Sequence, residues 1–569
     1  MSVKFKYLGI SVTFLCFLAV FLFFGIAYGA HICYQEQYQL FEWTWKYFAD
    51  TTGIPGGFAD WTGRFLTQFF FNKWIGAAVI ALSLVAAQLA CMSSVTRKTP
   101  VTYVCSFLPA LFLLLYYLDS TALVGGAVSI ILPLLCAAVV RQAEPSRIRT
   151  VLSMVLVPVM YFLAGPAAIV YAAALPKEES VITRVAALLL CLAMPFAAAP
   201  FCHYPLKSLL TGIHYSRIPQ NVPVFLWHSA FAAVILILAS SMDMKELPRK
   251  KSLSVSLVLA VLLAAGSVLL VDRHSDSVGE EMMKYDRLVY LEDWDGIINQ
   301  ASVKMPDKPL SVSALNLALA RKDLLGDWQF NYFQSGEAGL FPPYSISYFN
   351  LLPTSEIYWH LGMVGACQQY TFESQEAIPD FQKSARCYKR LAETYIVNGD
   401  YDVARKYLRA LDNTLHYRSW ARGIYEMLED ENAVESEYGP VRERRVMDPD
   451  ILFNESNKAA MLKLLIDRNP GNRLAQDYLI SMMLLAKDLD GLESQILASG
   501  RDPLPKFWQE AVIMQWVTKG RSLDTLPDAV GQDNISRMND FIGAMRSNRN
   551  ETYMKNHFGN TYWYYCIYE

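Results

Sequence analysis

The chain has 569 residues, of which 53% are hydrophobic and 18% are charged, and its formal net charge is −3. This length exceeds what one soluble core usually fills, so at least two domains are expected. The composition excludes a disordered or coiled-coil protein and is typical of a protein that crosses a membrane.

Charge divides the chain near residue 271. Residues 1–271 contain 18 Lys and Arg against 10 Asp and Glu, a net charge of +8, whereas residues 272–569 carry a net charge of −11. We therefore predict a transmembrane domain over 1–271, with an outer loop over 30–73, and a soluble domain over 272–569. The acidic half lacks the basic stripe that nucleic-acid binding requires, so no nucleic acid is expected as a partner.

Apolar stretches of about 20 residues, the length that crosses a bilayer as a helix, recur in the first half. We predict seven crossings, at residues 7–29, 74–92, 101–118, 124–140, 183–201, 222–241 and 252–271. A further apolar stretch, 151–175, is interrupted by Pro158 and by Gly165-Pro166. It is long enough to cross a membrane once but not twice.

Basic residues of short loops indicate orientation, because Lys and Arg stay in the cytoplasm. They cluster beside the N-terminus, after the second and fourth spans and before the last span: Lys4, Lys6, Arg97, Lys98, Arg141, Arg147, Arg149, Lys245, Arg249, Lys250 and Lys251. This pattern puts the N-terminus inside and the soluble domain outside, provided that 151–175 is a re-entrant pair of half-helices. One kinked crossing there would instead return the soluble domain to the cytoplasm.

The outer loop is rich in aromatic residues. Leu40, Phe41, Trp45 and Phe48 fall on one helical face, and a second aromatic set that includes Phe65 and Phe69 follows the turn at 54–57. We expect two amphipathic helices that lie at the membrane surface, with their rings at the level of the headgroups.

Carboxylates of this loop are the candidate catalytic groups: Glu36, Glu42 and Asp60, with Asp50 beside them. A carboxylate that faces a cavity could accept a proton from a hydroxyl group, or bind a divalent metal that neutralises a diphosphate leaving group. Alternatively, these groups are the solvated faces of interfacial helices. The sequence has no metal-ligand spacing, so no metal site is predicted and the cofactor is unknown.

Candidate substrate-binding residues are Arg64 in the outer loop and Lys207, His214 and Arg217 in a second loop, 202–221, which also contains His203. Arginine and lysine there could hold an anionic phosphate or a lipid headgroup. The alternative is a basic cytoplasmic loop with structural histidines.

The second half is helical, with turn residues between helices of 12 to 16 residues. Residues 391–411 have Ala392, Gly399, Tyr401, Ala404 and Leu408 at the spacings of a tetratricopeptide unit. The predicted fold is thus all-α: a polytopic transmembrane bundle followed by a soluble tetratricopeptide-like repeat domain. Such arrays bind a protein or peptide partner on their concave face.

Three stretches carry a resemblance: PGGFADWTGRFLTQFF; YDRLVYLEDWDGII with ALNLALARKDLLGD; and LAETYIVNGDYDVARKYLRAL with FGNTYWYY. Together they resemble an uncharacterised bacterial family of polytopic membrane proteins with a helical-repeat tail. The resemblance implies the architecture of a bacterial multi-pass membrane protein and no activity. The charge pattern predicts its place as the inner membrane, with the C-terminal domain in the periplasm.

More loosely, the chain resembles the C-type integral-membrane glycosyltransferases, which have a long outer loop after the first span and an acidic residue near its start. Glu36, in YQEQYQLF, stands at that place. The chain departs from that family in having no paired Asp-Glu or Asp-x-Asp motif and fewer spans than many members.

Two functions remain open. One is a glycosyltransferase-like enzyme that uses a lipid-linked sugar at the outer face, with membrane lipids around it. The other is a non-catalytic scaffold whose repeat domain recruits a protein. A transporter is disfavoured, because charges within the spans are nearly absent.

Overall fold

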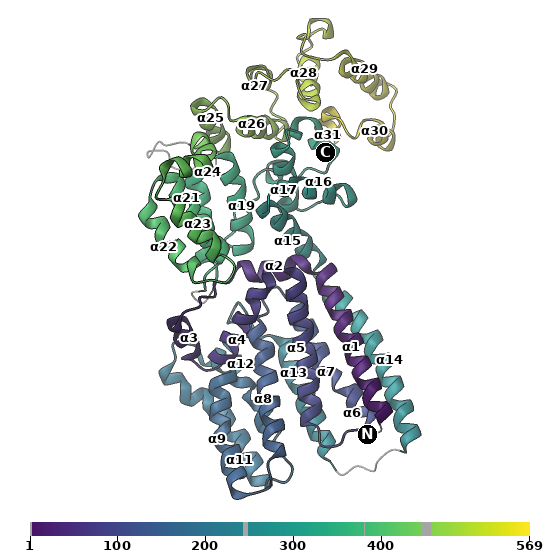
Figure 1. Ribbon diagram of the computed structural model, residues 1–569. Helices are drawn as coiled ribbons and strands as arrows, with labels where there is room; N and C mark the ends of the chain where they lie inside the picture. The colour runs from purple at the N-terminus through teal and green to yellow at the C-terminus, as the bar shows by residue number, and fades with distance from the viewer. Residues whose placement is uncertain (1–2, 243–247, 380–381, 446–456, 569) are drawn as a thin grey trace. The chain divides into compact units, whose positions relative to one another are not determined.

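The computed structural model describes residues 3–242, 248–379, 382–445 and 457–568, and these are all-α apart from one isolated bridge between Ala122 and Ser216 (Figure 1). The chain forms two compact units. We call Met1–Glu280 together with Ile378–Arg386 and Arg409–Arg422 the bundle unit. The tail unit comprises Glu281–Ala377, Cys387–Leu408 and Gly423–Glu569.

The helices of the first 280 residues are α1 (Val3–Ile26), α2 (Gly29–Gln37), α3 (Trp45–Thr52), α4 (Gly57–Thr67), η1 (Gln68–Phe71), α5 (Lys73–Ser94), α6 (Pro100–Cys105), α7 (Phe107–Tyr117), α8 (Val124–Gln142), α9 (Arg147–Ala164), η2 (Gly165–Ala167), α10 (Ala168–Ala173), α11 (Val181–Ala198), η3 (Ala199–Phe201), α12 (Leu206–Thr211), α13 (Val224–Ser241) and α14 (Arg249–His274).

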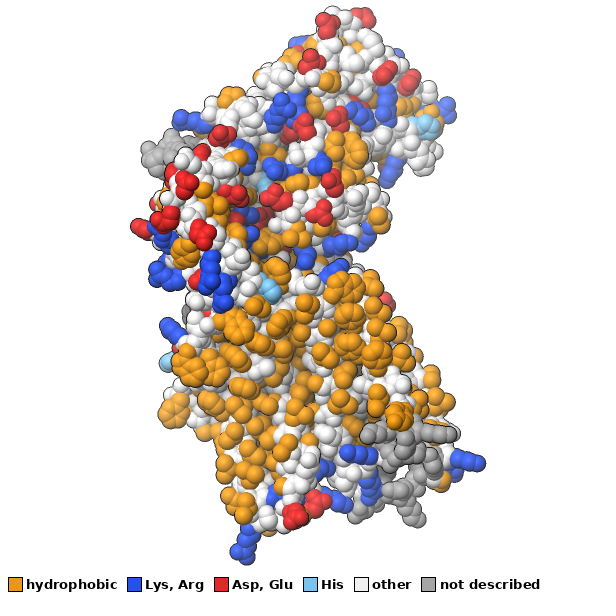
Figure 2. Space-filling model, in the orientation of Figure 1, with side chains coloured by type: hydrophobic (Ala, Val, Ile, Leu, Met, Phe, Trp, Pro, Cys, Tyr) orange, Lys and Arg blue, Asp and Glu red, His pale blue; other side chains and the backbone are white. Residues whose placement is uncertain are grey.

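Among the described residues of this unit, eight stretches are long and apolar enough to cross a membrane. They coincide, to within a few residues at each end, with the seven predicted crossings and the predicted interrupted stretch. Figure 2 shows hydrophobic side chains over the visible face of the bundle, with Lys and Arg at its lower end. Membrane association is therefore indicated. Lys245, one of the residues used to predict orientation, lies outside the described residues.

Hydrogen bonds show which helix ends lie together at each end of the bundle. At one end, Arg141 Nη1 donates to Thr96 Oγ1 over 2.7 Å and the Thr96 amide donates to Ser240 Oγ over 3.1 Å. We call this the basic end. At the opposite loop end, the Asp276 amide after α14 donates to Tyr28 Oη after α1 over 2.6 Å. The segment that leaves α14 therefore starts at the end of the bundle opposite the start of α1.

The interrupted stretch turns back on itself. α9 ends at Gly165, whose φ of 71° is one that glycine adopts readily, and η2 and α10 follow. Tyr171 Oη of α10 donates to the Ser153 carbonyl near the start of α9 over 3.2 Å, and Arg141 Nη2 donates to the Ala174 carbonyl over 3.0 Å. Both contacts return the chain to the basic end, so the interrupted stretch folds as a hairpin. That this hairpin enters and leaves the membrane on one side stays a prediction.

Tyr215 closes the break in this hairpin. Its hydroxyl donates to the Ala164 carbonyl over 2.6 Å and accepts from the Ala167 amide over 3.0 Å, so it pairs backbone groups that the interrupted helix leaves without partners. The Tyr116 hydroxyl donates in turn to the Tyr215 carbonyl. The hydroxyl thus gives hydrogen-bond partners to the backbone groups at the helix break. Within a membrane, such groups are costly to leave unpaired.

The first loop differs from its prediction in one part. Leu40 and Phe41 are not helical, because residues 39–43 form a segment without regular secondary structure between α2 and α3. Its backbone is paired with distant chain: the Ala385 amide donates to the Gln39 carbonyl over 3.2 Å, and the Trp43 amide donates to the Asn413 carbonyl over 2.7 Å. The helix predicted to start near Leu40 begins at Trp45 instead.

α4 packs against α8 with almost no space between the backbones. A Cβ atom added at Gly63 would lie 2.1 Å from the Gly125 amide nitrogen, and one added at Gly125 would lie 3.0 Å from Asp60 Cα. On its other side, α4 reaches α9, since the Gly56 amide donates to the Phe162 carbonyl over 2.8 Å. Glycine at these positions places α4, and therefore Asp60, between two apolar helices.

The remaining helices are α15 (Ser277–Tyr290), α16 (Trp294–Val303), α17 (Pro309–Arg321), α18 (Leu325–Trp328), η4 (Gln329–Asn331), η5 (Gly336–Gly339), α19 (Tyr348–Leu361), α20 (Val364–Glu376), α21 (Ala385–Asn398), α22 (Tyr401–Asp412), α23 (Arg418–Met427), α24 (Glu431–Arg444), α25 (Lys458–Arg468), α26 (Arg473–Leu485), α27 (Leu492–Ala498), α28 (Lys506–Thr518), η7 (Leu523–Thr525), α29 (Gln532–Arg546), α30 (Glu551–Phe558) and α31 (Tyr562–Tyr568).

The tail unit is a series of short helices. Residues 391–411, singled out in the sequence, fall on α21 and α22, and Gly399 with φ 84° lies between them. At the C-terminus, the rings of Tyr562 and Trp563 are fully buried, and Tyr562 Oη donates to the Leu484 carbonyl over 3.1 Å. The aromatic end of the chain therefore belongs to the core of this unit. Assignment of the helices to tetratricopeptide units stays a prediction.

Candidate functional site

Three of the predicted site residues meet at the loop end of the bundle. Asp60 and Arg64, one turn apart on α4, form a two-contact ion pair with Nε–Oδ1 and Nη2–Oδ2 distances of 3.0 and 2.9 Å. His214 Nδ1, from the second loop, lies 3.6 Å from Asp60 Oδ2. Arg64 Nη1 also donates to Tyr47 Oη of α3 over 3.3 Å. The Asp60 side chain is only 2% exposed, so this charged cluster is buried.

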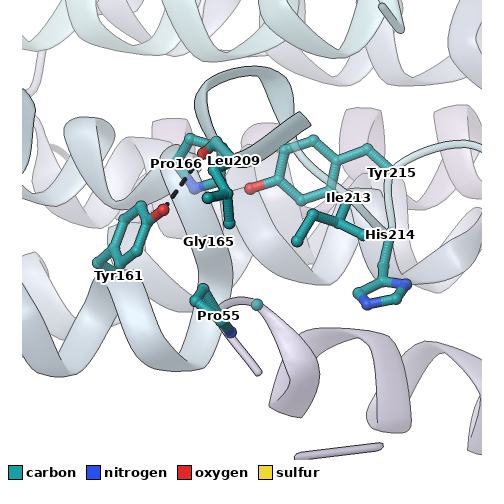
Figure 3. A pocket seen from close by; sticks show the side chains of 9 residues that line it. Pro55, Tyr161, Gly165, Pro166, Leu209, Ile213, His214 and Tyr215 are labelled. Carbon is teal, nitrogen blue, oxygen red and sulfur yellow. Dashed lines mark hydrogen bonds between the residues drawn. The ribbon is translucent and has the colours of Figure 1, made fainter. Parts of the chain in front are cut away.

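A small cavity borders this cluster. It is lined by Pro55 and Gly56 before α4, by the break at Gly165, and by Ile213, His214 and Tyr215 of the second loop (Figure 3). Tyr161 Oη also faces it and donates to the Leu209 carbonyl over 3.3 Å. Its volume of about 10 Å³ is room for about one water molecule. A sugar or a diphosphate does not fit in it.

Glu36 lies apart from the Asp60 cluster. Its side chain points from α2 to Tyr417, whose hydroxyl donates to Glu36 Oε2 over 3.3 Å. The residue is 6% exposed. Burial raises the pKa of the Glu36 carboxyl to about 8, and the hydrogen bond from Tyr417 opposes this rise only in part. Burial therefore favours the protonated form of the Glu36 carboxyl.

Arg217 is a buried structural residue in this arrangement. Nη1 donates to the Tyr38 carbonyl over 2.5 Å and Nη2 donates to the Gln35 carbonyl over 3.2 Å, so the guanidinium binds carbonyls at the C-terminal end of α2. The backbone amide of Arg217 also donates to the Thr121 carbonyl over 2.7 Å. The positive guanidinium lies at the C-terminal end of α2, where the helix dipole favours a cation.

The other two predicted residues are not part of either cluster. Lys207, on the short helix α12, is exposed. Glu42, in the segment between α2 and α3, is half-buried. The structure thus brings Asp60, Arg64 and His214 together, and places Glu36, Glu42, Lys207 and Arg217 elsewhere on the loop end. Neither Glu36 nor Arg217 lines the cavity beside Asp60.

Several partners of these groups were not foreseen from the sequence. Tyr47 and Tyr417 bind Arg64 and Glu36 as described above. Beside Glu36, Arg386 Nη1 donates to Gln37 Oε1 over 2.9 Å and Ser384 Oγ donates to the Gln37 carbonyl over 2.6 Å. Only Tyr47 carried a local signal, because it lies in the same aromatic loop as Asp60. Tyr417, Ser384 and Arg386 are more than 340 residues from Glu36 and Gln37.

The chemistry available here is limited. Asp60 and His214 are an acid–imidazole pair of the type that transfers protons, but Arg64 neutralises the carboxylate and the adjoining cavity is small. Within the described part of the chain, no group of three or more His, Cys, Asp or Glu side chains could hold a metal ion.

These features define a class: over its described residues, an all-α protein with eight apolar stretches long enough to cross a membrane, one of which folds back as a hairpin, and with loops packed into the bundle. The sequence also matches one family model over residues 4–569, described as a family of unknown function, DUF6057. The chain therefore belongs to this family. Comparisons with curated proteins and with solved structures found no match.

Proposed function

We propose that this protein is a membrane-anchored scaffold that holds its helical tail outside the cytoplasm, where the tail recruits a protein partner. The basic end, with Arg97, Lys98 and Arg141, is taken to lie in the cytoplasm, because Lys and Arg of short loops are retained there. The segment after α14 starts from the opposite end, which for a bacterial inner membrane is the periplasmic side.

One observation carries this proposal: the charged groups that would do chemistry are used inside the fold. Asp60 is bound to Arg64, Glu36 to Tyr417, and Arg217 to two carbonyls. Segments 378–386 and 409–422 belong to the bundle unit and pair with its first loop. The bundle thus binds two segments of the later chain. This favours a role as a membrane anchor for that chain over a role in catalysis.

The tail unit offers a surface for the partner. Val303 at the end of α16, Met305 after it and Phe333 after η4 are 86%, 50% and 43% exposed. The Phe333 amide donates to Met305 Sδ over 3.2 Å. Adjoining exposed apolar side chains of this kind mark protein interaction sites. The proposed partner therefore presents an apolar surface.

The test uses a photo-crosslinking amino acid placed in the full-length protein at Met305, at Phe333 or, as a control, at the exposed Lys519. We expect one adduct of the same mass from positions 305 and 333 and none from 519, and we expect Val303→Asp to remove it. Equal adducts at all three positions, or none at 305 and 333, would contradict the proposal.

A second candidate function, sugar transfer from a lipid-linked donor, is favoured by the meeting of Asp60, Arg64 and His214 from two loops. In this case Asp60→Asn abolishes a glycan or glycoprotein phenotype while the protein still accumulates. The scaffold proposal expects unchanged glycans and an unchanged adduct at position 305 in the same variant, provided that it folds.

A further inference from the structure

Exposed apolar side chains gather at the loop end of the bundle unit, and a lysine adjoins each group of them. We call this surface the collar and define it by Trp43, Trp45, Phe71, Trp74, Phe201, Leu206 and Leu210. Lys46, Lys73 and Lys207 are exposed next to Trp45, Trp74 and Leu206 in the sequence. Lys73 Nζ lies 5.5 Å from the centre of the Trp74 ring. Tryptophan and lysine together are typical of the membrane–water interface.

Helix α3 shows which way this surface faces. None of its residues is buried, and Trp45 is 79% exposed. Its inner side is fixed to α4, since Tyr47 binds Arg64 and the Phe48 ring lies 5.2 Å from that of Trp61. At 100° per residue, the exposed arc runs from Trp45 and Ala49 on one side to Lys46 and Asp50 on the other. The arc is therefore apolar on one edge and charged on the other.

The height of α3 along the bundle agrees with an interfacial position. The turn after α3 is attached to the last turn of α9, through the Gly56 amide and the Phe162 carbonyl. α9 has 18 residues and so rises about 27 Å from its start at the basic end. The hydrocarbon core of a bilayer is about 30 Å thick. The collar thus lies close to where the core ends and the headgroups begin.

We propose that the collar binds the phospholipid headgroup layer of the leaflet at the loop end. Trp45 and Ala49 face the acyl chains, Lys46, Lys73 and Lys207 bind lipid phosphate, and Asp50 stays in water. This assigns Lys207 to lipid in place of a substrate. Ile75, next to Trp74 on α5, and Val224, at the start of α13, are also exposed. The proposal does not depend on the scaffold function.

The first experiment measures depth. A small fluorescent amino acid replaces Trp45, Ala49 or Asp50, one at a time, in the full chain reconstituted in vesicles whose phospholipids carry a nitroxide near the headgroup. We expect quenching at positions 45 and 49 to be at least roughly twice that at position 50. Equal quenching at the three positions overturns the proposal. A blue-shifted emission at 45 without lipid quenching also overturns it, because a second protein copy would then cover the collar.

The second experiment identifies the source of the phosphate. We expect vesicles with anionic phosphatidylglycerol to raise the melting temperature of the wild type above its value in phosphatidylcholine. The triple variant K46Q/K73Q/K207Q should lose this increase, whereas a control, K519Q in the tail unit, should keep it. If inorganic phosphate in detergent solution gives the same increase as the anionic vesicles, or if the triple variant keeps it, lipid binding by these lysines is refuted.

Discussion

Replacing Gly63 by alanine should prevent most of the protein from reaching its folded state. The new methyl group would lie 2.1 Å from the Gly125 nitrogen and 2.5 Å from its Cα, and backbone atoms cannot rotate away as a side chain can. Overpacking that displaces side chains costs about 1 to 3 kcal/mol, and here a whole helix must shift. The measurement is the yield of monodisperse protein in mild detergent and its melting temperature.

Gly266→Ala is the matched control for this variant. Gly266 also lies within a helix, α14, and an added Cβ there meets nothing within 4 Å. We expect this variant to have the yield and melting temperature of the wild type. A Gly63→Ala protein that melts with the control would show that α4 does not pack against α8 as described.

Replacing Glu36 by glutamine should make the protein more stable at alkaline pH and leave it nearly unchanged at pH 5. Burial raises the pKa of Glu36 from 4.5 to about 8 in the folded protein, so between these values the folded state holds a proton that the unfolded state releases. The free energy of unfolding of the wild type therefore falls as pH rises through this window, by on the order of 4 kcal/mol. Glutamine has the same shape, accepts the Tyr417 hydrogen bond and does not titrate.

The measurement is the difference in melting temperature between Glu36→Gln and the wild type from pH 5 to pH 8.5. We expect this difference to grow with pH. Glu42→Gln, in the same loop at a half-buried position, serves as the control and should follow the wild type at every pH. If Glu36→Gln also follows the wild type at every pH, the carboxyl is not held protonated by burial.

The long apolar helices and the break in the interrupted stretch could be predicted because their causes are local. Runs of apolar residues indicate helices in a membrane, and the pair Gly165-Pro166 indicates a break. The choice between a kinked crossing and a return came from the charges of neighbouring loops, and the hydrogen bonds of Tyr171 and Arg141 now support the return.

The non-helical conformation of the segment around Leu40 could not be predicted, because the residues that it pairs with lie far away in the sequence. Leu40, Phe41, Trp45 and Phe48 have helical spacing, but the backbone of this stretch pairs with Ala385 and Asn413. Pairing with residues so far along the chain outweighs local periodicity and leaves no trace in the loop itself.

The candidate site was likewise predictable only where its residues are close in the sequence. The Asp60–Arg64 pair follows from a spacing of four residues on one helix. The addition of His214 required the second loop to fold into the bundle, and the partner of Glu36 lies at Tyr417. Single-sequence reasoning finds charged residues in a loop, but it does not show which of them the fold uses for its own structure.

We propose that the helical tail leaves the membrane on the side opposite the N-terminus. Paired reporters fused after the last residue test it directly: a phosphatase that is active only outside the cytoplasm, and a fluorescent protein that matures only inside. We expect an active phosphatase and a dark fluorescent protein. A bright fluorescent protein with an inactive phosphatase would place the tail in the cytoplasm and contradict the proposed scaffold.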